Sequence, residues 1–276
     1  AKRMKIPIYH IEAGNRCFDL NVPEEINRKI IDHISDFNLV YTEHARRHLL
    51  SEGLPHRRIY LSGSPMKEVL YKHFENIKSS KVLTECGIKK GKFFVVSTHR
   101  EENVDNFQHL NILLQTIERI RQEFHLPVIV STHPRTRKRL ESLPSSLSSD
   151  GIHFLKPFGF FDYNHLQMNA FCVISDSGTI SEESAILSFP AITVRNAIER
   201  PEALDTGNIV ITGLDTDTII QAIYLVTKEF DAIKDNPIPT EYAIENVSQR
   251  VVRLILGTAK LSHIWDGIKL NDTTLA

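Results

Sequence analysis

The sequence predicts an α/β protein built from parallel sheets in two lobes, of which the first is incomplete. Short apolar runs alternate with amphipathic stretches along most of the 276 residues, which is the rhythm of a parallel sheet with crossover helices. The rhythm restarts near residue 92 after a linking region, so one lobe follows another. A chain of this length is also too long for one ordinary small core.

The first lobe is predicted from the elements that precede residue 65. Strands are expected at 6–11, 37–42 and 58–64, and helices at 23–35 and 45–53. Three strands alone leave sheet edges and a helix face uncovered, which is costly in exposed apolar area. We therefore expect the natural protein to have more chain before Ala1.

The second lobe is predicted to be a complete doubly wound domain, because its strands and helices alternate without a break. A helix at about 65–77 precedes it. Strands are expected at 92–99, 127–133, 152–155, 171–176, 190–194 and 208–213, helices at 105–123, 135–142, 161–169 and 179–188, and two long closing helices at about 216–230 and 241–257. The predicted domain boundaries are 1–78, 79–240 and 241–276.

Composition excludes several classes of partner. The 33 Lys and Arg residues nearly balance the 34 Asp and Glu residues, so no overall field favours nucleic acid or an anionic membrane. No apolar run approaches the roughly 20 residues that span a bilayer. Three cysteines without metal-ligand spacing are typical of a reducing compartment, and we expect a cytoplasmic protein.

Acidic and basic side chains gather behind the first predicted strand. Glu12 directly follows it, at the carboxyl end of a parallel strand, where open α/β sheets build their sites. Glu24 lies in the first turn of the next helix, four residues before Arg28 on the same face. Two carboxylates held by Arg16 and Arg28 could share a proton-transfer task. Pairing of Glu12 with Arg16, and complementation of the helix dipole by Glu24, are the structural alternatives.

Two histidines end strands of the second lobe. His99 closes the strand at 92–99, and His133 closes the strand at 127–133. Because parallel strands bring their carboxyl ends to one edge, both imidazoles are expected above that edge, where they can donate to phosphate oxygens. A satisfied surface histidine is the structural alternative. A zinc site is the weaker hypothesis, since no third ligand has suitable spacing.

The segment SDSGT at 175–179 predicts a phosphate site. Ser177 and Gly178 precede a helix whose first N–H groups have no partner within the helix, although Ser and Asp also cap helices for structural reasons alone. Glu183 suits hydrogen bonds from ribose hydroxyls. Arg200, in a later loop, could clamp a diphosphate, although a solvated loop charge is as common. Signatures of a nicotinamide or ATP site are absent from the sequence, and no cofactor is expected.

Six motifs in this order resemble those of the UDP-N-acetylglucosamine 2-epimerase family. They are HIEAGNRCFD at 10–19, PEEINR at 23–28, STHREE at 97–102, THPR at 132–135, SDSGTISEE at 175–183 and ERPE at 199–202. The resemblance implies two Rossmann-like lobes in the GT-B arrangement, with a cleft between them and a final helix that crosses back to the first lobe. It also implies a UDP-amino sugar substrate, no redox cofactor and a homodimer.

The resemblance further implies a mechanism. A base removes the proton at carbon 2 of the sugar as UDP leaves to give a glycal, and UDP adds back after reprotonation from the other face. By motif, Glu12 and Glu24 become the acid/base pair, and His99 lies at the departing diphosphate. The substrate-binding set is Arg16 and Arg28 beside the carboxylates, Ser177, Gly178 and Arg200 at phosphate, Glu183 at the ribose, His133 along the cleft, and Phe160 of the KPFGFF loop at the uracil.

Finer sequence forms favour one branch of the family. The forms GNRCFD, THREENVDN and ESAILSFPAITVR resemble the branch that forms UDP-N-acetyl-L-fucosamine from a UDP-2-acetamido-2,6-dideoxy-L-hexose for capsule or O-antigen lipopolysaccharide. The alternatives are an epimerase that makes UDP-N-acetylmannosamine, a GT-B glycosyltransferase, and an inactive fragment that only binds UDP. A glycosyltransferase would not need the paired glutamates. The fragment is an alternative because family members carry further residues before the HIEAG strand.

Overall fold

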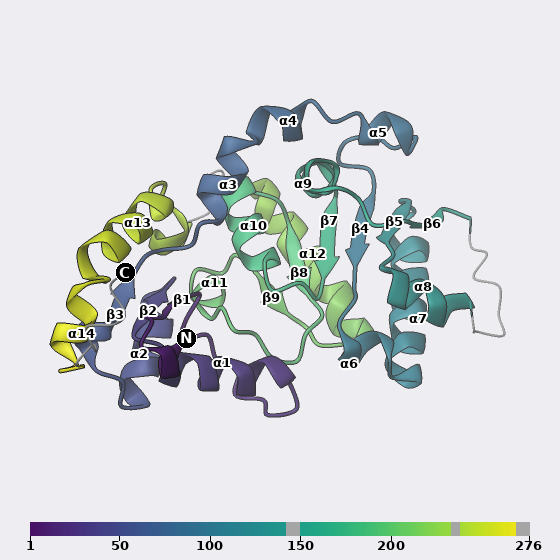
Figure 1. The fold of residues 1–276 in the computed structure, drawn as a ribbon. Coiled ribbons are helices and arrows are strands. Elements are labelled where there is room, and N and C mark those ends of the chain that lie inside the picture. Colours follow the sequence, from purple (N-terminus) through teal and green to yellow (C-terminus); the bar gives the residue numbers. More distant parts are fainter. Residues whose placement is uncertain (142–149, 233–237, 269–276) are drawn as a thin grey trace. The chain divides into compact units, whose positions relative to one another are not determined.

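The structure, a computed structural model, describes residues 1–141, 150–232 and 238–268. The chain divides into two compact units, and each is described by itself (Figure 1). The first unit comprises Ala1–Val69, Ala197–Glu202 and Pro239–Ala276, and the second comprises Leu70–Asn196 and Ala203–Ile238.

The first unit contains a three-stranded parallel sheet in the order β1-β2-β3. Its elements, in chain order, are η1 (Lys2–Met4), β1 (Tyr9–Ile11), α1 (Pro23–Ile34), β2 (Phe37–Val40), α2 (Glu43–Ser51), η2 (His56–Arg58), β3 (Ile59–Leu61), η3 (Thr240–Tyr242), α13 (Val247–Thr258) and α14 (Leu261–Trp265). A small apolar core joins Val40 and Ile59 of the sheet to Ala45 and Leu49 of α2. Helix α1 begins at Pro23, because proline fits the first helical position, where its missing N–H is not needed.

The C-terminal helices pack within the first unit. The Tyr9 hydroxyl of β1 and the Thr258 hydroxyl of α13 form a hydrogen bond of 2.7 Å. The rings of Phe37 and Trp265 lie 6.2 Å apart, centroid to centroid. These contacts join residues more than 200 positions apart in the sequence, so α13 and α14 lie against β1 and β2.

The second unit contains a six-stranded parallel sheet in the order β6-β5-β4-β7-β8-β9. Its strands are β4 (Phe94–Ser97), β5 (Val128–Ser131), β6 (Ile152–Leu155), β7 (Cys172–Ser175), β8 (Ala191–Thr193) and β9 (Val210–Ile211). Its helices are α4 (Phe74–Lys78), α5 (Val82–Glu85), α6 (Glu101–Val104), α7 (Phe107–Phe124), α8 (Pro134–Glu141), α9 (Phe160–Asn169), α10 (Ile180–Leu187), α11 (Glu202–Asp205) and α12 (Thr216–Ala232), with α3 (Met66–Lys72) joining the two units.

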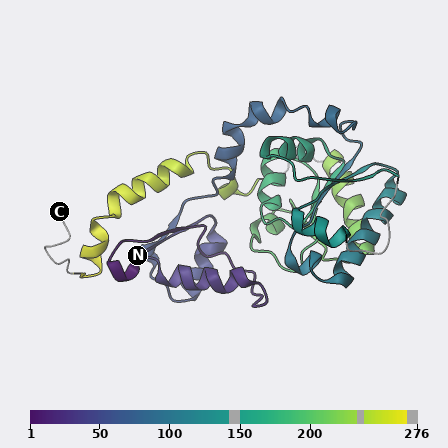
Figure 2. The same cartoon turned by 45° about the vertical axis from the view of Figure 1, so that its right-hand side comes forward.

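Both faces of the six-stranded sheet are covered by helices (Figure 2). Phe94 and Val96 of β4 pack with side chains of α7 and α12 in one apolar cluster. Val95 and Val173 point to the opposite face and are equally buried. This is why the strands read as nearly continuous apolar runs rather than as alternating ones.

Strand order places a topological switch point between β4 and β7. From β4 the chain continues outward through β5 and β6, and it then returns to β7 and continues through β8 and β9. Open parallel sheets bind ligands outside the carboxyl ends of their strands at such a point. Residues 98–103 and 176–179 follow these two strands, so they are candidates for contact with a ligand.

The structure corrects the predicted helix at 241–257. The chain instead forms the short turn η3 and begins α13 only at Val247. Tyr242 is fully buried and donates its hydroxyl proton to Glu202 at 2.5 Å, and the Glu241 carbonyl accepts from the Ser64 N–H. These tertiary contacts hold the backbone in a non-helical path that helical periodicity could not reveal.

Two smaller differences concern helix ends. The helix predicted at 65–77 is broken at His73 into α3 and α4, because His73 has φ of −111° and ψ of 12°. The sequence did not predict α5 or α6, each of four residues, since one turn is too short to show a period. All nine predicted strands are present; Ile152–Leu155 has the predicted bounds, and the other eight strands are two to four residues shorter than predicted.

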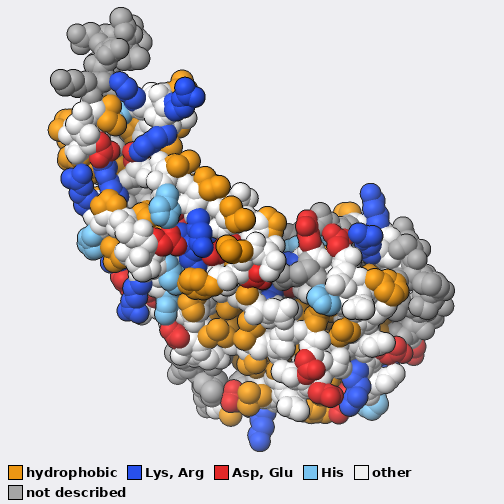
Figure 3. Space-filling model, turned by 90° about the horizontal axis from the view of Figure 1, so that it is seen from below, with side chains coloured by type: hydrophobic (Ala, Val, Ile, Leu, Met, Phe, Trp, Pro, Cys, Tyr) orange, Lys and Arg blue, Asp and Glu red, His pale blue; other side chains and the backbone are white. Residues whose placement is uncertain are grey.

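Charge is mixed over the surface seen in Figure 3, where Lys and Arg side chains lie among Asp and Glu and hydrophobic side chains are scattered between them. This agrees with the formal net charge of −1. None of the helices in the described ranges combines the length and apolar character that a bilayer span requires.

Gly14 provides a test of the packing behind β1. Its φ is +81°, and a Cβ built there would collide with the Ala45 carbonyl. We expect Gly14→Ala to lower the free energy of unfolding by about 3 kcal/mol or more, because left-handed strain and overpacking add. Gly53→Ala, with φ of +86° and open space around the new methyl, should cost only about 1 kcal/mol. Urea unfolding of both variants measures the difference, and equal losses would contradict the close approach.

Candidate active site

Glu12 lies in the turn after β1, and its backbone has φ of 67°. Residues with a Cβ rarely adopt this left-handed conformation, so the surroundings must hold it. Its Oε1 accepts hydrogen bonds from Asn15 Nδ2 at 3.1 Å and from Arg200 Nη2 at 2.8 Å. The side chain is still 45% exposed. The structure thus presents a half-exposed carboxylate at a strand end, steadied by an amide and an arginine.

Asp32 of α1 is fully buried beneath this turn. It bonds to His10 Nδ1 at 2.7 Å, accepts from the Gly14 N–H at 3.2 Å, and pairs with Arg16 Nη1 at 2.7 Å. These three partners come from both sides of Glu12 in the sequence. Asp32 was not predicted as a site residue, because nothing in its local pattern distinguishes it from an ordinary helix residue.

The Arg16 side chain is buried and pairs with acidic side chains in the protein interior. Its guanidinium is fully buried, and besides Asp32 it donates to both oxygens of Glu52, at 2.7 and 2.8 Å. Hydrogen bonds from Arg16 hold the pKa of the Glu52 carboxyl below its ordinary value, although partial burial acts in the other direction. The Arg16 guanidinium therefore has no exposed surface in this structure, and its contact with substrate stays a prediction. Its partners are Asp32 and Glu52, not Glu12.

Glu24 and Glu25 differ sharply although they are adjacent. Glu24 is exposed on the first turn of α1, whereas Glu25 is fully buried and accepts from the Cys17 N–H at 2.9 Å. Arg28 lies 3.7 Å from Glu25 and bonds to Glu199 at 3.2 Å. Glu24 and Arg28 were expected to lie together on the helix surface. Arg28 instead lies beside the buried carboxylates of Glu25 and Glu199. Glu25 and Glu199 were missed because their role depends on burial.

The segment Ala197–Glu202 joins the first unit through three side chains, although the chain on either side of it belongs to the second unit. Glu199 bonds to Arg28, Arg200 to Glu12, and Glu202 to the Tyr242 hydroxyl. All three are buried. The motif ERPE therefore anchors this segment beside the Glu12 turn.

In the second unit, Asp176 binds the loop that carries His99. Fully buried, it accepts from the backbone N–H groups of His99 and Arg100 at 3.0 to 3.1 Å and from Asn103 Nδ2 at 2.9 Å. The His99 side chain is 46% exposed and lies with Nδ1 3.4 Å from Asp176. The rings of His99 and His133 are 6.1 Å apart. The structure thus brings both histidines to one edge of the sheet, next to the switch point.

Ser177 and Gly178 form the turn into α10. Ser177 Oγ lies 3.0 Å from Thr179 Oγ1 and accepts from the Thr179 N–H at 3.3 Å. Glu183, one turn into the helix, accepts from Thr179 Oγ1 at 3.0 Å and from Gln167 Nε2 at 2.8 Å. The carboxylate of Glu183 is therefore fixed by neighbours within the second unit, and Gln167 is a partner that the sequence did not predict.

Phe160 is the first residue of α9, and 43% of it is exposed. Its ring contacts His73 and Phe161 edge-on, at centroid distances of 6.4 and 5.8 Å. It is thus a partly exposed member of an aromatic group. An exposed ring of this kind can stack on a base.

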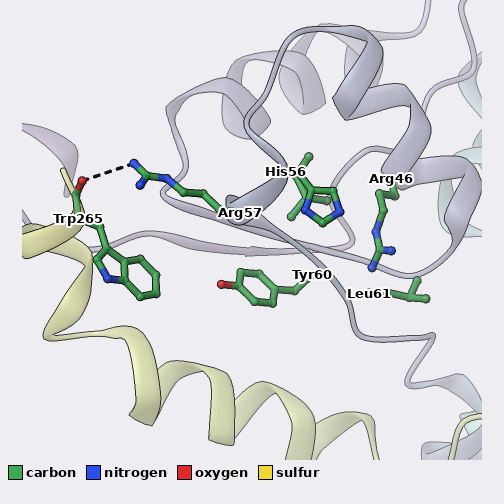
Figure 4. A pocket seen from close by; sticks show the side chains of 7 residues that line it. Arg46, His56, Arg57, Tyr60, Leu61 and Trp265 are labelled. Atoms are coloured by element: carbon green, nitrogen blue, oxygen red, sulfur yellow. Dashed lines mark hydrogen bonds between the residues drawn. The ribbon is translucent and has the colours of Figure 1, made fainter.

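One cavity of about 540 Å³ lies in the first unit and is shown in Figure 4. Tyr60 and Trp265 lie on one side, near Arg57, and Arg46 lies on the other. None of the predicted site residues lines it, so this cavity does not coincide with the predicted site. Within the described ranges no group of three or more His, Cys, Asp or Glu side chains could hold a metal ion.

Fold and strand-end chemistry together define a class. Two units of Rossmann type, each built on a parallel sheet, match the α/β lobes of GT-B proteins. Charged and polar side chains lie at the strand ends of both units. The family profile described as UDP-N-acetylglucosamine 2-epimerase matches residues 1–256. The chain belongs to the UDP-N-acetylglucosamine 2-epimerase family, which is a family of isomerases. The predicted α/β fold with two Rossmann-like lobes is confirmed.

Solved structures and curated relatives agree. UDP-N-acetylglucosamine 2-epimerase from Rickettsia bellii is 44% identical with a TM-score of 0.87, over 95% of this chain and 70% of that one. The Methanocaldococcus jannaschii enzyme, solved in complex with UDP-GlcNAc and UDP, is 31% identical with a TM-score of 0.84, over 93% and 71%. The curated Methanococcus maripaludis enzyme is 32% identical over 94% of this chain and 71% of its own length. The chain spans 63% of the length of the curated M. jannaschii enzyme.

Asp176 provides a test of the second unit. Asp176→Ala leaves the His99 and Arg100 N–H groups and the Asn103 amide without their acceptor, and we expect a loss of about 2–4 kcal/mol in unfolding free energy. Amide hydrogen exchange at His99 and Arg100 should accelerate. The control is Asp217→Ala, at an exposed position of α12, which should change stability by no more than about 0.5 kcal/mol. Unchanged exchange at His99 would refute the role assigned to Asp176.

Proposed function

We propose that this chain carries the machinery of a non-hydrolysing 2-epimerase that acts on a UDP-2-acetamido sugar. Membership of the family supports this, as do the relatives solved with UDP-GlcNAc from M. jannaschii and Neisseria meningitidis. The observation that carries the proposal is the Glu12 carboxylate, held half-exposed at a strand end by Arg200 and Asn15.

The reaction is an elimination followed by an addition. A carboxylate takes the proton at carbon 2, the electron pair of that bond forms a double bond between carbons 1 and 2, and the anomeric C–O bond breaks with its pair leaving on UDP. Protonation of carbon 2 from the other face, with return of UDP to carbon 1, gives the epimer. No net oxidation occurs, so the chemistry requires no redox cofactor. Glu12 and Glu24 are the proposed acid and base, and such groups contribute about 10²- to 10⁴-fold each.

The second unit is proposed to hold UDP. His99 is assigned to the departing diphosphate, and Ser177 with Gly178 to a phosphate at the start of α10, where backbone N–H groups and the helix dipole favour an anion. The switch point beside these residues supports the assignment. The remaining proposed roles are contact of Glu183 with the ribose, His133 as a residue that lines the substrate site, and contact of Phe160 with the uracil.

Arg200 and Arg28 have proposed roles beside the carboxylates. Arg200 bonds to Glu12, and a guanidinium with several N–H groups can hold a carboxylate and a phosphate oxygen together. Arg28 bonds to Glu199 and would act on substrate through the position of the Ala197–Glu202 segment. Arg200 is therefore proposed to bind a phosphate oxygen of the leaving diphosphate.

The cellular setting follows from the same proposal. Nucleotide-sugar synthesis for capsule or O-antigen lipopolysaccharide would occur in the cytoplasm, and the three free cysteines suit a reducing compartment. A homodimer is part of the proposal, on the resemblance to the family. Light scattering of the purified chain tests the dimer.

Deuterium exchange tests the proposed reaction. Incubation with a UDP-2-acetamido sugar in deuterated water should place deuterium at carbon 2, and Glu12→Gln should slow this by about 10²- to 10⁴-fold because the amide cannot take the proton. UDP binding, measured by calorimetry, should be retained. Glu75→Gln, at a surface acid of α4 whose side chain is 87% exposed, is the matched control. Sugar transfer to an acceptor would identify a glycosyltransferase instead, and binding without exchange a UDP-sugar binding protein.

The finer proposal concerns the sugar. The forms GNRCFD, THREENVDN and ESAILSFPAITVR support a UDP-2-acetamido-2,6-dideoxy-L-hexose, with UDP-GlcNAc as the alternative substrate. We expect kcat/KM for the 6-deoxy sugar to exceed that for UDP-GlcNAc by about 10-fold or more, the range that one small group supplies in a binding pocket. A higher kcat/KM for UDP-GlcNAc would reject the 6-deoxy substrate and leave the epimerase proposal intact.

A further inference from the structure

We propose that Asp32 is the positioning residue for the Glu12 turn, an inference that rests on the proposed epimerase function. Asp32 is fully buried, so it cannot touch substrate. Its carboxylate bonds to the residues that flank Glu12 and thereby sets where the Glu12 carboxylate lies.

The contacts of Asp32 bracket Glu12. His10, two residues before, bonds through Nδ1 to Oδ1 at 2.7 Å, and the N–H of Gly14, two residues after, donates to Oδ2 at 3.2 Å. Arg16, four residues after, pairs with Oδ2 at 2.7 Å. Both ends of the turn are therefore tied to one rigid point on α1, and the turn can move only if these bonds break.

The turn needs such an anchor because it is strained. Glu12 and Gly14 have φ of 67° and 81°, and Phe18 follows with φ of 57°. A left-handed residue with a Cβ costs about 1–2 kcal/mol. The chain around β1 would relax toward an extended path if nothing held it, and the Glu12 carboxylate would move with it.

The negative charge of the Asp32 carboxylate is used at this site, because Arg16 is its ion-pair partner. The Gly14 N–H and the Arg16 guanidinium are donors, and an ionised carboxylate accepts at both oxygens. Both donors bond to Oδ2, where an amide oxygen could still accept, but an asparagine carries no charge and would leave Arg16 with Glu52 as its remaining ionic partner. His10 bonds through Nδ1, so Asp32 also fixes the orientation of this ring beside Glu12.

Asp36 supplies a matched control on the same stretch of chain. It is also buried, and it accepts from the Ile8 N–H at 2.8 Å and pairs with Lys2 at 2.5 Å. It thus anchors the start of β1, ahead of the Glu12 turn, and makes no bond to residues 10–16 among the described contacts. Asp32→Asn and Asp36→Asn therefore remove equal charge from neighbouring buried sites with different consequences for Glu12.

The test compares both variants in the full chain. We expect Asp32→Asn to lower kcat for epimerisation by about 10²-fold, the scale of a misplacement near 1 Å, with KM and UDP affinity nearly unchanged. Amide exchange at Gly14 should accelerate in this variant. Asp36→Asn should leave kcat within about threefold of the wild type, as expected for a site that does not touch the machinery.

Several outcomes would overturn the inference. A folded Asp32→Asn protein with wild-type kcat would do so, and so would a parallel fall of kcat, UDP affinity and thermal midpoint, which indicates a merely structural role. If Asp32→Asn does not fold, His10→Ala removes one bond to Asp32 and should still lower kcat; an unchanged kcat would count against the proposal. If the wild type itself shows no exchange at carbon 2, the proposed function fails, whereas Gly14 amide exchange still reports whether Asp32 holds the turn.

Discussion

Burying the backbone donors that follow a parallel strand is the constraint on which the rest of this structure depends. Where a strand ends, its ladder of hydrogen bonds ends too, and the N–H groups of the next residues need acceptors. Each unit meets this need with one buried aspartate. Asp32 accepts from the turn after β1, and Asp176 accepts from the loop after β4.

In this arrangement buried and exposed side chains have different roles. Asp32 and Asp176 have no exposed surface and bond to backbone and side-chain groups of the neighbouring turns, whereas Glu12 and His99 are about half exposed. Charged groups that do no chemistry hold those that are proposed to do it. The same division explains why Arg16 pairs inward with Glu52 while Arg200 reaches Glu12.

Strands and strand ends were predictable from sequence because their signals are local. An apolar run followed by small or polar residues gives a strand end, and parallel topology gives the edge to which it belongs; His99 and His133 were placed together on that ground. The helix predicted at 241–257 was wrong at its start, because the burial of Tyr242 on Glu202 outweighs helical periodicity. The inward pairing of Arg16 was not predicted for a related reason, since a charge beside a strand end looks the same in sequence whether it points outward or inward.

By itself the sequence determined the order of the strands and of most of the longer helices, the near neutrality of the chain, and the motifs that resemble one family. These depend on residue type and spacing, which can be taken directly from the sequence. Tertiary structure alone decided which carboxylates are buried and which are presented: Glu25 and not Glu24 is enclosed, and Glu199 and Arg200 lie beside residues about 170 to 190 positions earlier. The physical reason is that burial and ion pairing are properties of neighbours in space, and folding brings those neighbours from distant parts of the chain.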